Sequence, residues 1–198
     1  MIYPIATMLA RAFYHSPFYR YIMPTDSRRL AQLSWWMSCM VRYSIRYGLL
    51  CTTPGTVDGA ALWLTPTAPY LKTPQLLFSG FALAPLWIGI SDSKRLLEIS
   101  SEWEDLHREE QYPHWYLLII GVEPARQGQG VGSRLIQSVL TQADRDRLPC
   151  YLETTNEHNL AFYQKHGFEI VVHRAHRQRL NYWTMRRSPR GMADVGTP

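Results

Sequence analysis

The chain has 198 residues, of which 46% are hydrophobic and 19% are charged. This size and balance predict one globular domain with a core of its own, and they exclude an intrinsically disordered chain. The net charge of +5 resides in residues 173–198, which hold six arginines and one aspartate. Because residues 1–172 are neutral overall, we expect a neutral domain with a basic end and no nucleic-acid partner.

The first half of the chain predicts helices and one hairpin. Apolar spacing predicts a helix over residues 5–14, which Ser16-Pro17 ends. Ser27 is the expected cap of a second helix that runs to Tyr47 and stops at Gly48. Strands are then expected at 49–52 and 57–64, and helices at about 75–88 and 92–110.

The second half alternates strands and helices, which indicates an α/β sandwich with a mixed sheet. A single domain is predicted over residues 1–187, followed by a flexible tail over 188–198. The expected strands are 114–122, 149–154, 168–172 and 180–186, and the expected helices are 128–147 and 160–166.

Cysteine usage and apolar runs bear on the compartment. Cys39, Cys51 and Cys150 form no C-x-x-C pair, so we expect free thiols, no metal site and a reducing cytoplasm. The first residues lack the regions of a signal peptide. Residues 76–90 form the longest apolar stretch, which is too short to span a bilayer and predicts a buried or interfacial segment without stable membrane insertion.

The turn between a predicted strand and the helix that follows it carries the strongest signal. Pro124 turns the chain, and Gly128, Gly130 and Gly132 stand at alternate positions as the helix begins. Glycine lets the backbone approach a ligand closely, and free N–H groups at a helix start bind anions. The segment predicts a pyrophosphate site. It lacks the lysine of a P-loop, and Ser133 stands where the dinucleotide fingerprint requires glycine.

The segment Arg126-Gln127-Gly128-Gln129-Gly130-Val131-Gly132 resembles the cofactor signature of the GCN5-related N-acetyltransferase (GNAT) family. The dense resemblance covers residues 114–172, and within the family it is greatest to the puromycin N-acetyltransferases. It implies an α/β (α+β) fold with a mixed, mostly antiparallel sheet flanked by helices, and acetyl-CoA as the acyl-donor cosubstrate. Family members open with a strand before the first helix, whereas this chain begins almost inside its first predicted helix. We therefore expect that the sheet lacks its first strand, or that the start codon is placed late. The supporting segments are 114–117, 121–124, 152–154, 159–163, 167–168 and 183–186.

The resemblance also implies where the cosubstrate binds. A bulge near residues 120–122 would splay this strand from the next one. The pantetheine arm would pair with that segment, and the backbone N–H of Val122 would polarise the thioester carbonyl. The implied cofactor-binding residues are Ile120, Gly121, Val122, Gln127, Gly128, Gln129, Gly130, Val131, Gly132, Ser133, Asn159 and Tyr163.

Acetyl transfer to an amine needs a neutral amine, a donor to the developing oxyanion and a proton for the departing thiolate. Tyr163 is four residues after Asn159 and shares its helix face; the resemblance makes Tyr163 the acid, whereas spacing alone favours a core aromatic. Glu153 is a candidate base or ammonium ligand, and a surface carboxylate is the alternative. His107 is a second candidate base, with a surface histidine as the alternative.

The acceptor is the least determined part. Six of the seven tryptophans lie in the first 115 residues, and Tyr19 and Trp63 are candidate acceptor contacts beside Glu153, with core packing as the alternative. We expect an acetyl-CoA-dependent N-acetyltransferase that acts by direct attack of a primary amine of a small molecule, as a monomer or homodimer. Acetylation of a protein or peptide amine, and a catalytically silent acyl-CoA-binding regulatory module, stay open.

Overall fold

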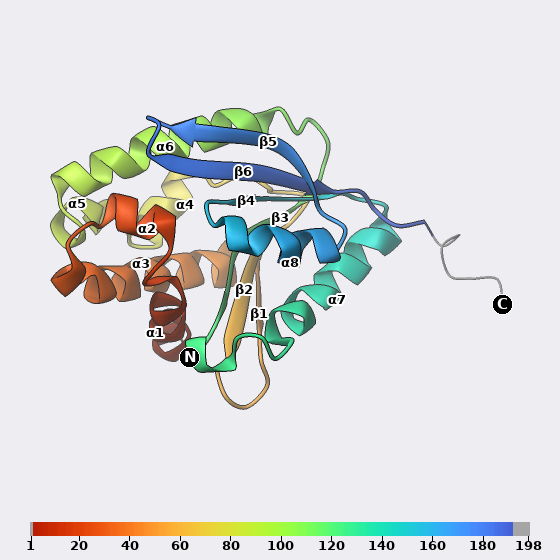
Figure 1. The fold of residues 1–198 in the computed structure, drawn as a ribbon, viewed down its shortest axis with the longest axis horizontal. Helices are drawn as coiled ribbons and strands as arrows, with labels where there is room; N and C mark the ends of the chain where they lie inside the picture. Colours follow the sequence, from red (N-terminus) through yellow and green to blue (C-terminus); the bar gives the residue numbers. More distant parts are fainter. Residues whose placement is uncertain (1, 192–198) are drawn as a thin grey trace.

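The computed structural model describes residues 2–191 and has a six-stranded sheet with helices on both faces (Figure 1). The strand order is β1-β2-β3-β4-β6-β5. Every neighbouring pair is antiparallel except β3 and β4, which are parallel. The mixed, mostly antiparallel sheet predicted from the sequence is therefore confirmed. The first element described is a helix, as expected.

Three helices open the chain: α1 (Ile2–Phe13), α2 (Pro17–Ile22) and α3 (Asp26–Tyr47). The predicted cap of α3 is wrong, because Thr25 precedes the helix and Ser27 lies inside it. Gly48 follows the helix as predicted, and a Cβ there would lie 2.3 Å from the Trp63 carbonyl oxygen. Helices α1 and α3 pack together against one face of the sheet through a common apolar core.

The hairpin of β1 (Leu49–Thr52) and β2 (Gly59–Leu64) follows α3, and its strands pair in register from Leu49 opposite Trp63. The next segment differs from the prediction of one helix over 75–88. It contains α4 (Thr73–Phe78), a short 3₁₀ turn and α5 (Ala84–Trp87). Gly80 has a φ of +112°, and Pro85 lies in the first turn of α5, where its missing N–H would interrupt a longer helix. Helix α6 (Ile90–Arg108) follows.

The rest of the chain alternates as predicted. It contains β3 (Trp115–Val122), a 3₁₀ turn (Pro124–Arg126), α7 (Val131–Asp146), β4 (Cys150–Thr154), a 3₁₀ turn (Glu157–Asn159), α8 (Leu160–Lys165), β5 (Glu169–His176) and β6 (Leu180–Arg187). Helices α7 and α8 share a core with alternate residues of β2, β3 and β4, on the sheet face opposite α1 and α3. Each of these strands therefore sends side chains into two separate cores.

Arg187 ends β6 and forms a two-pronged ion pair with Asp144 of α7, with distances of 2.7 and 2.8 Å. The backbone N–H of Arg190 donates to the same carboxylate over 2.8 Å. The chain thus stays against α7 at residue 190. The predicted tail over 188–198 extends beyond the described residues, which end at 191.

Candidate functional site

Strands β3 and β4 pair over three positions and then separate. The pairs are Trp115 with Cys150, Tyr116 with Tyr151 and Leu117 with Leu152. Beyond them β3 continues to Val122, still paired on its other side with β2. The backbone edge of residues 118–122 therefore faces an opening in the sheet, which we call the β3–β4 opening. A strand edge of this kind offers N–H and C=O groups to an extended ligand.

A bulge on β3 accompanies this opening. Leu62 pairs with Ile119, whereas the next residue, Trp63, pairs with Leu117. Leu118 is therefore the extra residue on β3, just before the segment 120–122 near which the bulge is predicted. The predicted residues Ile120, Gly121 and Val122 lie on the free edge, because β4 does not follow β3 past Leu117.

The glycine-rich loop lies just beyond the free edge. Gly128 and Gly130 both have a φ of +75°, a left-handed conformation that favours glycine. Among residues 2–191, the backbone N–H groups of residues 128–133 donate to no acceptor. Three of them begin α7, where the helix itself provides no partner. A run of free amides at a helix start suits the oxygens of a diphosphate.

The polar side chains of this loop stabilise it from within. The Gln127 amide donates to the Val122 carbonyl over 3.1 Å, and the Gln129 amide donates to the Ala125 carbonyl over 3.2 Å. Arg134 donates to the Gln129 carbonyl, also over 3.2 Å. Gln127 and Gln129 are predicted to bind the cofactor, and their side chains shape the loop, while the backbone N–H groups of residues 128–133 remain available.

Helix α8 closes on the loop from one side. A Cβ on Gly132 would lie 3.3 Å from the Phe162 ring, so glycine lets α8 approach the start of α7. The next residue, Tyr163, packs in the core that includes Leu117 and Leu152, where β3 and β4 separate. Asn159 precedes α8 and is partly exposed.

The Tyr163 hydroxyl makes no hydrogen bond to the described residues, and it is not among the fully buried atoms that lack a partner. Burial raises the pKa of Tyr163, so the hydroxyl keeps its proton at neutral pH. This group is placed as an available proton donor beside the β3–β4 opening.

Glu153 of β4 lies on the opposite face of the sheet from Tyr163. Its Oε2 atom accepts a hydrogen bond of 2.7 Å from the Tyr116 hydroxyl, and its Oε1 atom is buried with no partner among residues 2–191. Burial raises the pKa of Glu153 to about 7, although the bond from Tyr116 partly opposes that change. A carboxylate with a pKa near 7 and an unused oxygen is suited to accept a proton.

Tyr116 is a candidate site residue that the sequence analysis missed. Tyr116 and Glu153 are 37 residues apart and lie on different strands. The parallel register of β3 and β4 brings them together, and a tyrosine in a strand has no local feature that reveals this pairing.

His107 of α6 packs against Tyr116, with their ring centroids 4.4 Å apart. Its ring stacks on Tyr151 with a centroid separation of 4.6 Å, and its Nε2 atom is 2.6 Å from Nε2 of His114. Burial and the neighbouring imidazole lower the pKa of His107 to about 3. His107 is therefore neutral at physiological pH and is a weaker base than Glu153.

The two candidate acceptor contacts differ in position. Trp63 has no exposed surface and packs against Trp115 in the core beneath α7, so it offers no surface to an acceptor. Tyr19 of α2 is buried on the other face, near Tyr116, whose pKa is raised mainly by burial and to a smaller extent by neighbouring groups that include the Tyr19 hydroxyl. Tyr19 thus lies on the Glu153 side of the opening.

The raised pKa of Glu153 predicts a pH-dependent stability. A carboxyl whose pKa rises from 4.5 to about 7 on folding holds its proton more tightly in the fold, so stability falls as pH rises through that window. Near pH 4.5, Glu153→Gln is therefore expected to have the same free energy of unfolding as the wild type. Above about pH 7 the variant should be more stable by up to about 3 kcal/mol. Urea denaturation at several pH values measures this, and a constant difference between the proteins would contradict it.

Part of the chain matches a known family model, and one curated protein is similar over most of its length. Residues 96–170 match the family model described as "Acetyltransferase (GNAT) domain". The chain is 26% identical over 171 residues to "Uncharacterized N-acetyltransferase C550.08" of Schizosaccharomyces pombe, covering 82% of this chain and 68% of that protein.

Two solved structures share the fold. The structure titled histone acetyltransferase HPA2 and related acetyltransferase, from Corynebacterium glutamicum, has a TM-score of 0.65 and 19% identity, covering 94% of this chain and 90% of that one. Arylalkylamine N-acetyltransferase 2 from Aedes aegypti has a TM-score of 0.57 and 13% identity, covering 94% and 93%.

Proposed function

We propose that this protein, an acetyl-CoA-dependent acyltransferase with a GNAT acetyltransferase domain, transfers the acetyl group to a primary amine of a small molecule by direct attack. One observation carries the proposal. The β3–β4 opening lies between a loop of free amides with a protonated tyrosine on one face of the sheet and a carboxylate of raised pKa on the other.

The face that carries α7 and α8 is assigned to the donor. The free amides of residues 128–133 would bind the diphosphate, and the edge of β3 at residues 120–122 would pair with the pantetheine arm. Acetyl-CoA supplies an activated acyl group as a thioester. The backbone N–H of Val122 is assigned to the thioester carbonyl, and Asn159 is assigned to the donor arm beside α8.

The other face is assigned to the acceptor. An alkylammonium must lose a proton before it attacks. Glu153 has one oxygen held by Tyr116 and one with no partner in the described part of the chain, which suits it to take that proton directly or through water. Tyr163, on the donor side, is assigned to protonate the departing sulfur. Tyr19 is assigned to the acceptor wall.

The covering of the acceptor face favours a small molecule over a peptide. Helix α6 crosses that face, where Trp103 packs near Tyr182 of β6 and His107 stacks on Tyr151 of β4. Phe18 of α2 stacks on Trp103 with a centroid separation of 4.8 Å. These contacts enclose the face, whereas a peptide substrate requires an open groove.

Two alternatives are kept, a protein or peptide N-acetyltransferase and a silent acyl-CoA-binding regulatory module. Thiol release measured over a panel of small amines and lysine-bearing peptides distinguishes them. Turnover with peptides alone supports the first alternative, and binding of acetyl-CoA without turnover on either panel supports the second. The similarity to puromycin N-acetyltransferases, the cytoplasmic location and the monomeric or homodimeric state stay predictions.

The assignment of the donor site predicts that Gly130→Val weakens coenzyme A binding by roughly 10- to 100-fold, the effect of losing one hydrogen bond to a charged group. Gly130 has a φ of +75°, which valine tolerates poorly, so the amides of the loop would be displaced. Isothermal titration calorimetry with coenzyme A measures the change.

Gly55 provides the matched control. It has a φ of +78° in the β1–β2 turn, and a Cβ there meets no atom within 4 Å. Gly55→Val therefore imposes a similar backbone strain outside the loop. If both variants lose affinity equally, strain explains the result and the loop is not the diphosphate site.

A further inference from the structure

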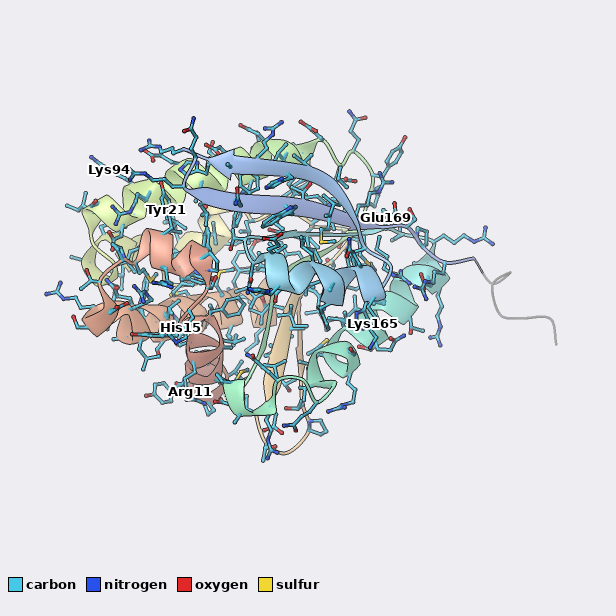
Figure 2. All side chains as sticks on the ribbon, in the orientation of Figure 1. Arg11, His15, Tyr21, Lys94, Lys165 and Glu169 are labelled. Carbon is cyan, nitrogen blue, oxygen red and sulfur yellow. The ribbon has the colours of Figure 1, made fainter. Side chains whose placement is uncertain are left out.

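A second feature of the molecule is a cavity of about 780 Å³ between α2, the first half of α6 and the turn that joins β5 to β6. None of its lining residues is among those assigned above to the acetyl donor or the acceptor. Figure 2 places Tyr21 and Lys94, two of its lining residues, on the same side of the molecule. Its charged lining residues are Arg20, Lys94, Arg95, Arg177, Arg179 and Glu98.

Two of the five cations are fixed by the fold. Arg95 pairs with Asp92 and donates to the Ile22 carbonyl of α2 over 3.2 Å. Arg177 pairs with Glu98 over 2.9 Å. Arg20, Lys94 and Arg179 have no carboxylate partner within residues 2–191. The cavity therefore has an excess of positive charge that an anionic ligand would neutralise.

The turn that presents two of these arginines is conformationally unfavourable. Arg177 and Gln178 have φ values of +47° and +56°, a region that residues with a side chain rarely adopt. The Arg179 N–H donates to the His176 carbonyl over 2.9 Å and closes the turn. The hairpin between β5 and β6 thus fixes this turn, and Arg177 and Arg179 both line the cavity.

An apolar rim adjoins the cavity. Ile90 and Leu97, which we call the apolar rim, are both 68% exposed. Ile90, Lys94 and Leu97 are spaced by four and three residues, so they share one face of α6, and Lys94 also lines the cavity. Residues 59–91 contain no acidic side chain. Exposed apolar groups beside unpaired cations are typical of a surface that contacts an anionic bilayer.

We propose that this surface binds an anionic phospholipid bilayer, with a headgroup phosphate in the basic cavity and the apolar rim at the headgroup–acyl boundary. Guanidinium groups match phosphate oxygens, and the rim removes apolar area from water. A second copy of the chain is a poorer occupant, because a two-fold contact through this face would bring the unpaired cations against their own copies. No helix within residues 2–191 is long and apolar enough to cross a membrane.

The test is co-sedimentation of the full chain with vesicles of phosphatidylcholine alone or mixed with phosphatidylserine. The mixed vesicles are expected to bind the protein, and molar salt is expected to release it. Arg20→Gln/Lys94→Gln should weaken binding about 25-fold, since each cation near an anionic surface contributes about fivefold. Ile90→Gln/Leu97→Gln should weaken it as well, through the rim.

The matched control is Arg145→Gln/Lys165→Gln, which changes the net charge equally on α7 and α8, where both cations are exposed. Figure 2 shows Lys165 away from Lys94. Equal weakening by both charge variants, or no binding to mixed vesicles, would overturn the proposal.

Three further outcomes would also overturn it. The first is that soluble glycerophosphoserine binds as tightly as the vesicles do, and that the rim variant, Ile90→Gln/Leu97→Gln, does not change its affinity. This result would indicate a site for a soluble anion. The second is a dimer, seen by light scattering, that the rim variant abolishes. The third is that Arg20→Gln/Lys94→Gln raises the KM for acidic amines and leaves vesicle binding unchanged.

Discussion

Glu153→Gln is expected to lower kcat/KM for amine acetylation by roughly 100- to 10,000-fold, the contribution of a general base. The pKa of Glu153 is about 7, and only the ionised carboxylate accepts a proton. The wild-type kcat/KM should therefore rise with pH and level off near that value. The variant should lose this rise, because the amide does not titrate. Thiol release measured across the pH range gives both results.

Two further measurements test whether the loss in Glu153→Gln comes from removing a general base. Coenzyme A affinity should be unchanged in Glu153→Gln, since the carboxylate lies on the acceptor face. Tyr116→Phe removes the hydroxyl that donates to Oε2 and favours the charged carboxylate. That variant should shift the rise in kcat/KM to higher pH. A rise that persists unchanged in Glu153→Gln would show that another group accepts the proton, and Glu153 would then be structural.

Local chemistry explains which parts of the fold the sequence predicts well. The turn before α7 is predicted because Pro124 and alternate glycines impose a backbone conformation without help from distant residues. The segment 75–88 is predicted poorly, because its apolar spacing resembles a helix and outweighs Gly80 in the pattern. In the structure, Gly80 has a φ of +112° beside Arg42 and Cys39 of α3, so a tertiary contact determines the break.

In the candidate site too, local sequence features predict some residues, and tertiary contacts determine the others. Tyr163 and Glu153 are identified by residue type and by their place in a family pattern, and both lie at the β3–β4 opening. Tyr116 is not, because only the register of two strands distant in sequence brings it to Glu153. Trp63 was predicted as an acceptor contact, yet alternation along β2 turns it toward the core under α7. Which face a short strand presents depends on the packing around it.

The parallel pairing of β3 and β4 is what makes a two-sided site possible. Both strands point toward the opening, so Leu152 and Glu153 send adjacent side chains to opposite faces just where the strands separate. In the proposed function, the donor face then has the Tyr163 hydroxyl, and the acceptor face has the Glu153 carboxylate. An acid and a base on the two sides of one gap can handle two protons without neutralising each other.

Tyr163→Phe is therefore expected to lower kcat roughly 10- to 1000-fold while coenzyme A affinity stays nearly constant. The hydroxyl has no hydrogen-bond partner among the described residues, so its removal leaves no group unpaired. Burial raises its pKa, so the wild type retains the proton through the whole neutral range. Steady-state thiol release and calorimetry with coenzyme A measure the two quantities.

Tyr43→Phe is the matched control, since it removes a hydroxyl from a buried tyrosine of α3 that bonds to Gln75 over 2.7 Å. That variant should lose some stability and keep its kcat. If Tyr163 acts as the acid, a further result is expected that a packing role would not produce. An acetyl donor whose thiol is more acidic needs less protonation, so the loss in Tyr163→Phe should shrink with such a donor. A loss that is equal for both donors would mean that Tyr163 only shapes the opening and that the thiolate leaves without its help.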